Sequence, residues 1–265
     1  MPTFFTDDIS LHYEIDGKGP PLLLIAGMVS DSASWLPLMP LLVDHFTVIR
    51  PDNRTTGRTK PWDAPTSMAH SADDCAALLE HLSFPRAHVL GHSMGGLMAL
   101  QLATTHPTSI QTITLAASAP VRMTRNTALF SALIDIRQSD AAPDLWLRAF
   151  FPWLFAPAVF DDPTAIHAAA EAALAYPYAQ STQAMRHQLH ALKDYDPTTI
   201  DIHHPVQALL ADNDLLIPMA IAQSALATLP GLTTHVIPNA GHSIHWDAPD
   251  RVADHVLSFT SYHPI

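Results

Sequence analysis

The segment 87–107 contains the pattern that most restricts how this chain can fold. A short apolar run, AHVL, leads into Gly91-His92-Ser93-Met94-Gly95-Gly96, and a long apolar segment with helical spacing follows at once. A strand that turns into a helix at a single residue strains that residue, and side chains two positions to either side are expected to collide with it. Glycine removes the collision. Three of the nine glycines of the chain lie in this hexapeptide, which predicts a sharp turn with Ser93 at its tip.

Strand-type and helix-type segments alternate on both sides of this turn. Runs typical of strands lie at 9–16, 22–26, 45–51, 87–92, 110–118, 206–211 and 232–238. Helical spacing occurs at 32–44, 66–82, 94–107, 219–229 and near 248–260. Such alternation is typical of an α/β fold, a mostly parallel sheet with helices on both faces.

The strand signal is absent between about 120 and 197. This stretch is rich in Ala, Leu and aromatic residues, and five prolines are expected to divide it into short helices. We therefore predict an α/β core made of residues 1–119 and 198–265. Residues 120–197 are predicted to form a helical cap, or lid, inserted after the strand at 110–118.

Composition narrows the classes of partner. Hydrophobic residues make up 48% of the chain, enough for a large core, and the formal net charge is −12. An acidic surface repels phosphate backbones and anionic lipid, so we expect no nucleic-acid or membrane partner. The first residues have neither the basic nor the apolar region of a secretion signal, which favours a cytoplasmic protein. A homo-oligomer remains possible.

No metal or disulfide chemistry is indicated. Cys75 is the single cysteine, and it lies beside two aspartates in a helical pattern, so it is expected to be a buried, unreactive thiol. The 17 histidines are scattered. The pairs His203–His204 and His242/His245 lack the further ligands that a zinc site needs.

A serine hydroxyl needs a base within hydrogen-bond reach to act as a nucleophile. His242 follows the last predicted strand on a loop that contains Gly241, and it is the favoured base for Ser93. His245 is the competing candidate. Because the chain is expected to turn into the next segment there, His245 is interpreted as a residue at the edge of the pocket or in the packing.

The acid that orients the base is expected after the preceding strand, 206–211. Asp212 and Asp214 both follow that strand. Asp214 is preferred because it lies further out, where its side chain can turn back toward the histidine, and Asp212 is then a turn residue. The alternative position after the strand 110–118 reads Ala-Ala-Ser-Ala, without a carboxylate.

A tetrahedral intermediate also needs two N–H donors, an oxyanion hole. One is expected to be the backbone amide of Met94, directly after the serine. The other is expected from the loop after the strand 22–26, with Met28 as the choice. Gly27 would let the backbone approach the substrate oxygen closely.

At this point the chain resembles the α/β-hydrolase family over essentially its whole length. The matching blocks are PPLLLIAGMVSDSASW, HFTVIRPDNRTTGRT, AHVLGHSMGGLMALQLATTHP, PVQALLADNDLLIP and VIPNAGHSIHWDAP. The resemblance aligns the acid with Asp214 and implies a cap after the sixth strand of that fold. Within the family, the chain looks most like 3-oxoadipate enol-lactonase, aminoacrylate/carbamate hydrolases and small carboxylesterases. A serine nucleophile argues against haloalkane dehalogenases and epoxide hydrolases, whose relatives have aspartate there.

The chain departs from the family pattern at two points. The usual His-Gly at the oxyanion loop is Ala26-Gly27, and the usual DNRG is DNRT, so that Thr55 replaces a glycine. The second change is expected to alter a nearby loop. Arg54 and Arg58 in the same block are interpreted as structural residues.

The expected reaction is hydrolysis of a small carboxylic ester or lactone through an acyl-enzyme on Ser93, with no cofactor. A C–C bond hydrolase, a thioesterase or a carbamate/aminoacrylate hydrolase would use the same residues. An alternative of another class is a non-catalytic ligand-binding member of the fold.

The cap contributes the candidate pocket residues. Its aromatic side chains, Trp146, Phe150 and Trp153 among them, are expected to form the core of the cap, and some are expected to line an apolar pocket. Arg122 and Arg125 lie where the cap begins. One of them is a candidate to bind an anionic substrate group with its guanidinium, and the alternative is that both are exposed cap charges.

Overall fold

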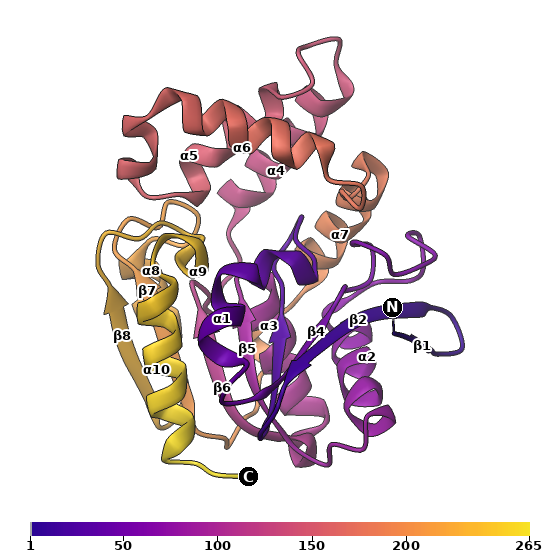
Figure 1. The fold of residues 1–265 in the computed structure, drawn as a ribbon, viewed down its shortest axis with the longest axis vertical. Coiled ribbons are helices and arrows are strands. Elements are labelled where there is room, and N and C mark those ends of the chain that lie inside the picture. The colour runs from indigo at the N-terminus through magenta and orange to yellow at the C-terminus, as the bar shows by residue number, and fades with distance from the viewer. Residues whose placement is uncertain (1) are drawn as a thin grey trace.

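The computed structural model describes residues 2–265. In this part of the chain, eight strands form one sheet in the order β1-β2-β4-β3-β5-β6-β7-β8 (Figure 1). The strands are β1 (Thr3–Phe5), β2 (Ser10–Gly17), β3 (Pro21–Ile25), β4 (Thr47–Pro51), β5 (Ala87–His92), β6 (Ile110–Ala116), β7 (Val206–Ala211) and β8 (Leu232–Ile237). Only β2 runs antiparallel to its neighbours β1 and β4; the pairs from β4 to β8 are parallel. The predicted α/β class is confirmed.

Helices cover both faces of the sheet. The core helices are α1 (Met39–Leu42), α2 (Met68–His81), α3 (Met94–Thr105), α8 (Met219–Leu226), α9 (Ile244–Asp247) and α10 (Pro249–Ser261). One apolar layer packs α1 and α10 against one face, and a second packs α2, α3 and α8 against the other. Among residues 2–265, none of the helices combines the length and the apolar character that crossing a bilayer requires.

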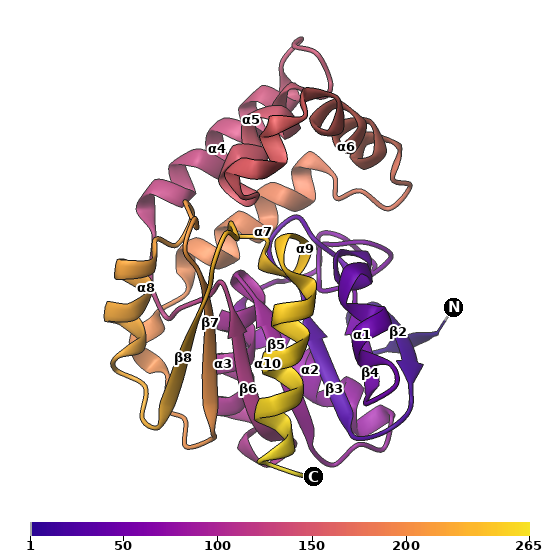
Figure 2. The same ribbon diagram turned by 60° about the vertical axis from the view of Figure 1, so that its left-hand side comes forward.

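The predicted helical insertion lies between β6 and β7. It contains α4 (Thr124–Gln138), α5 (Leu145–Leu154), α6 (Pro163–Ala175) and α7 (Thr182–Asp194). Figures 1 and 2 show α4, α5 and α6 above the sheet, beyond the carboxyl ends of the parallel strands. The inserted helical region after β6 is thus confirmed, while the division into a core and a separate cap at residues 120 and 197 stays a prediction.

Three local details differ from expectation. The edge strand β1 was not predicted, because three residues are too few to show a period. The segment 32–44 is mostly a 3-10 helix (Ser32–Leu38), since Pro37 and Pro40 cannot donate backbone hydrogen bonds. Pro152 was expected to end a helix but lies within α5. It lies in the last turn of that helix, so it removes only the one hydrogen bond that its own amide would have donated, and the helix ends two residues later.

The loop after β4 is tied down by the two arginines. Arg54 is buried and pairs with Asp74 and Asp8, and Arg58 pairs with Glu14 at 2.8 Å and with Asp52 at 3.2 Å. Their expected structural role is therefore confirmed. Elsewhere, burial raises the pKa of the Cys75 thiol, as expected for an unreactive side chain.

The glycines of the turn are required for a different reason than the sequence suggested. A Cβ on Gly91 would lie 2.7 Å from the Cα of Gly96, and a Cβ on Gly95 would lie 2.7 Å from the carbonyl oxygen of Ala26. The collisions are therefore between the two flanks of the turn, and between α3 and the end of β3. Ser93 is not among the nearest atoms, so glycine serves close backbone packing.

We predict that Gly95→Ala destabilises the protein by about 3 kcal/mol or more, because backbone atoms that cannot move aside occupy the space of the new methyl group. Gly231→Ala is the control. Gly231 has a φ of +65° and open space around it, so its substitution costs only the conformational penalty of about 1–2 kcal/mol. Urea unfolding measures both, and an equal or smaller cost at Gly95 would contradict the steric argument.

Candidate active site

Ser93 lies at the tip of the turn between β5 and α3. Its backbone is left-handed, with φ 52° and ψ −119°, which is strained for a residue with a side chain. Two hydrogen bonds hold it. Its amide donates to the carbonyl of Ala116 at 3.0 Å, and its carbonyl accepts from the hydroxyl of Ser118 at 2.7 Å. Strand β6 therefore supports the strained residue from the side.

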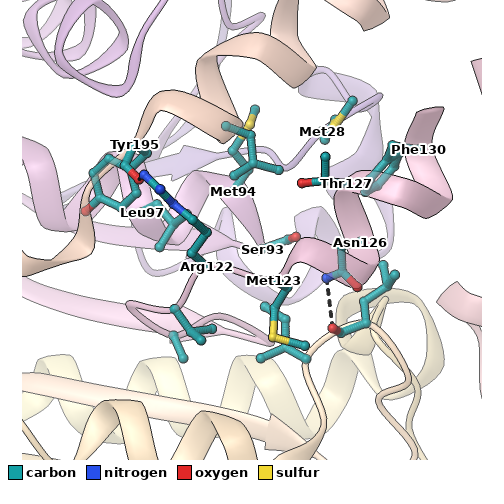
Figure 3. Close-up of a pocket in the computed structure, with 15 residues that line it drawn as sticks. Met28, Ser93, Met94, Leu97, Arg122, Met123, Asn126, Thr127, Phe130 and Tyr195 are labelled. Carbon is teal, nitrogen blue, oxygen red and sulfur yellow. Dashed lines mark hydrogen bonds between the residues drawn. The ribbon is translucent and has the colours of Figure 1, made fainter.

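Ser93 is partly exposed and faces a narrow cavity. The volume of this cavity is about 50 Å³. In Figure 3, Ser93 lies between Arg122 and Tyr195 on one side and Phe130 and Asn126 on the other. The lining residues are Met28, Ser93, Met94, Leu97, Ala119, Val121, Arg122, Met123, Asn126, Thr127, Phe130, Leu192, Tyr195, Leu216 and Ile217. The core and the cap both contribute to it.

The structure brings Asp214 and His242 together. Their side chains are each only 2% exposed, and Nδ1 of His242 lies 2.9 Å from Oδ2 of Asp214. The other carboxylate oxygen accepts from the backbone amides of Leu216 and Ile217, both at 2.8 Å. Asp212 is exposed and accepts from the side-chain amide of Asn213 at 2.7 Å. The later of the two candidate carboxylates is thus the one that faces the imidazole.

His92 connects this pair to the turn. Its Nε2 donates to the carbonyl oxygen of His242 at 2.9 Å. Burial, together with the nearby His242, lowers the pKa of His92 to about 3, so its ring stays neutral. The loop that carries His242 is thereby attached to the residue directly before Ser93.

His245 is buried and does not line the cavity. Its ring packs 4.8 Å from that of Trp35 and 4.4 Å from that of His92, measured between ring centroids. Burial lowers its pKa well below the ordinary value, and its Nδ1 has no hydrogen-bond partner in the described residues. This placement agrees with packing, the second of the two interpretations, and not with the edge of the pocket.

The two predicted oxyanion donors, Met28 and Met94, both line the cavity beside Ser93. Met94 is the first residue of α3, where a backbone amide has no partner within the helix. A Cβ on Gly27 would lie 3.1 Å from the Cβ of Ser93, so the loop after β3 passes directly beside the serine. Gly27 itself is not among the lining residues.

The two cap arginines have different surroundings. Arg122 lines the cavity and donates to the carbonyl of Tyr195 at 2.6 Å. Arg125 does not line it; its guanidinium donates to the carbonyl of Leu215 and lies 5.4 Å from the centre of the Trp153 ring. Of the two candidates, Arg122 is the one near Ser93.

The aromatic residues predicted for the pocket pack elsewhere. Trp146 and Phe150 are buried in the apolar core, and Trp153 is half-buried against it. None of the three lines the cavity. Phe130 of α4 lines it instead, with Phe150 packed edge-on behind it at 5.3 Å between ring centroids. The aromatic cluster is mainly the core of the cap, and its contact with the cavity is indirect.

Several lining residues were missed, although some could have been found. Leu97 lies one helical turn after Ser93, and Leu216 and Ile217 come two and three residues after Asp214. A similar argument applies to 119–123, because β6 lies beside β5. Nothing in the sequence pointed to Leu192 or Tyr195, which reach the cavity from the far end of the cap.

Comparison with known proteins agrees with this geometry. The model described as "Alpha/beta hydrolase family" matches residues 22–255. The chain belongs to the alpha/beta hydrolase family. Among members of this family, a protein of Azorhizobium caulinodans named carbamate hydrolase RutD is 26% identical over 264 residues, covering 98% of each chain.

Solved structures of alpha/beta hydrolases superpose closely. A hydrolase from Pseudomonas aeruginosa is 25% identical, with a TM-score of 0.84, and the match covers 98% of this chain and 97% of that one. An enol-lactonase from Burkholderia xenovorans is 21% identical, also with a TM-score of 0.84, and the match covers 98% of this chain and 100% of that one. At 21% identity, the likeness to the enol-lactonase shows a shared fold and nothing more.

The buried histidines give this alpha/beta hydrolase a predicted acid sensitivity. His92 and His245 have lowered pKa values in the folded chain, whereas in the unfolded chain each binds a proton below pH about 6.5. The free energy of unfolding therefore falls as the pH drops from 6.5 toward 4, by up to about 1.4 kcal/mol per pH unit for each histidine. His245→Leu should weaken this dependence, and exposed His203→Leu should not. Urea unfolding between pH 4.5 and 7 measures this dependence. If the free energy of unfolding changes equally with pH in both variants, the prediction is wrong.

Proposed function

We propose that this chain is a serine hydrolase that cleaves a small carboxylic ester or lactone through an acyl-enzyme on Ser93. The observation that carries the proposal is the buried hydrogen bond between Asp214 and His242, attached through His92 to the strained serine at a cavity. A dry carboxylate–imidazole pair, on loops bonded to the residue before a partly exposed serine on a strained turn, is costly for a fold and suits nucleophilic catalysis.

In the proposed mechanism, Oγ of Ser93 attacks the substrate carbonyl and its proton passes to Nε2 of His242. Asp214 holds Nδ1–H of the imidazole, which fixes the tautomer and stabilises the imidazolium that forms. The two amide donors to Asp214, from Leu216 and Ile217, keep its carboxylate in place.

The negative charge that develops on the carbonyl oxygen would be stabilised by the amides of Met28 and Met94. The imidazolium then protonates the leaving group. A water molecule, deprotonated by His242, hydrolyses the acyl-enzyme in the second half of the reaction and regenerates the hydroxyl of Ser93.

The size and lining of the cavity support a short substrate. About 50 Å³ holds little more than a short acyl chain or a small ring, and most of the lining side chains are apolar. A carbamate is the second candidate, because the relative in Azorhizobium caulinodans is named for that substrate.

Turnover of a panel of short esters, lactones, thioesters and carbamates tests the proposal, with Ser93→Ala as the blank. We expect the highest kcat/KM for an ester or lactone. Asp214→Asn should lower kcat/KM by about 10³-fold or more, because the imidazole loses its correct tautomer, whereas Asp212→Asn should change it less than about threefold. Equal effects of the two variants would remove Asp214 from the mechanism, and preference for a carbamate would select the second candidate.

A non-catalytic ligand-binding role is the alternative from another class. A fluorophosphonate that labels Ser93 in the wild type but not in His242→Ala would exclude it, because a pure binder needs no activated hydroxyl. Absence of both labelling and turnover would favour the binding role.

Arg122 is the proposed contact for an anionic substrate group, because it lines the cavity and its guanidinium bonds Tyr195, another lining residue. Arg122→Ala should raise KM for an ester with a free carboxylate by about tenfold and leave KM for the neutral methyl analogue nearly unchanged. Arg125→Ala is the matched control, since this arginine lies outside the cavity lining. An unchanged KM for the acidic ester in Arg122→Ala would remove the assignment.

A further inference from the structure

The residue directly after Met28 is held in a strained conformation by the cap. Val29 has a φ of +64°, a left-handed backbone that is a clear outlier for a β-branched side chain. Its amide donates to the side-chain oxygen Oε1 of Gln188 at 3.1 Å, across 159 positions of sequence. Gln188 belongs to α7 and is only 1% exposed. A buried cap side chain therefore bonds the loop that carries a proposed oxyanion donor.

A second buried glutamine extends this contact. Nε2 of Gln180, which precedes α7, donates to Oε1 of Gln188 at 3.1 Å and to the carbonyl of Thr55 at 3.0 Å. The directions of these bonds are fixed. Because the amide of Val29 can only donate, Gln188 must present its oxygen, and Gln180 must then present its nitrogen.

Thr55 is the residue that replaces a glycine of the family pattern, and it too is left-handed, with a φ of +74°. Each such conformation costs on the order of 1–2 kcal/mol and persists only where its surroundings hold it. The strained residues Val29 and Thr55, from the loops after β3 and β4, are thus joined through one pair of cap glutamines.

The segment 26–29 is anchored at both ends. At its start, the side-chain amide of Asn53 donates to the carbonyl of Ala26 at 2.9 Å. At its end, Gln188 holds the amide of Val29. Met28 lies between the two anchors, so the torsions that aim its amide are restricted from the core on one side and from the cap on the other.

We propose that Gln188 is a positioning residue that aims the backbone amide of Met28 at the oxyanion, a role that rests on the proposed function. The cap then completes the catalytic machinery in addition to covering it. A third contact supports this coupling: the hydroxyl of Tyr176, at the end of α6, donates to Asp31 of the same loop at 2.9 Å.

Three variants test the role of Gln188. Gln188→Met keeps the length of the side chain but removes the acceptor. Gln188→Glu keeps an acceptor that both Val29 and Gln180 can reach. Gln183→Met changes an exposed glutamine of the same helix and is the matched control.

For Gln188→Met we expect kcat on the best ester to fall about 10- to 100-fold with KM within threefold, because the lost interaction acts mainly in the transition state. The inhibition constant of a trifluoromethyl ketone, whose Ser93 adduct carries an oxyanion, should rise by a similar factor. Gln188→Glu should restore most of both losses, and Gln183→Met should behave as the wild type. If Gln188→Met does not fold, Gln188→Asn takes its place in the comparison, because the shorter side chain withdraws the amide oxygen from Val29.

The outcomes separate the two proposals. A wild type without Ser93-dependent turnover would reject the proposed function, and the role of Gln188 with it. Normal wild-type turnover with an unchanged kcat in Gln188→Met, a loss confined to KM, or equal losses in the Met and Glu variants would reject the role of Gln188 alone.

Discussion

Close contact of backbone with backbone at the start of α3 is the constraint on which the site depends. Gly95 lies against the end of β3, and Gly91 lies against the first turn of α3, at distances that no Cβ could occupy. This approach forces the chain to turn at Ser93 alone, and it brings the loop after β3 beside the hydroxyl. One packing requirement thus produces both the strained serine and the proximity of the proposed oxyanion donor.

The parallel sheet brings the remaining groups to the same edge. The carboxyl ends of β5, β7 and β8 carry Ser93, Asp214 and His242 in turn, so the parallel sheet places residues that are far apart in sequence at the same edge. Two hydrogen bonds from side chains to backbone carbonyls then fix the residues His242 and Ser93. His92 holds the carbonyl of His242, and Ser118 holds that of Ser93.

The cap contributes to the site through polar contacts as well as apolar cover. The aromatic residues Trp146, Phe150 and Trp153 belong to its apolar core, whereas Phe130 and Tyr195 line the cavity. Its buried glutamines instead reach down to strained residues in the core loops. Under the proposed function, this insertion would both limit the size of the substrate and restrict the backbone that stabilises the developing charge.

The sequence by itself determined the features that depend on short stretches: the alternation of strands and helices, the turn at Ser93, and the positions of Asp214 and His242 just after their strands. These follow because glycine spacing and apolar periodicity act locally. Only the tertiary structure decided that His245 packs away from the cavity, that Arg122 and not Arg125 reaches it, and that Gln188 meets Val29. Such contacts join residues up to 159 positions apart, and their formation depends on how the cap sits on the sheet, which no local pattern encodes.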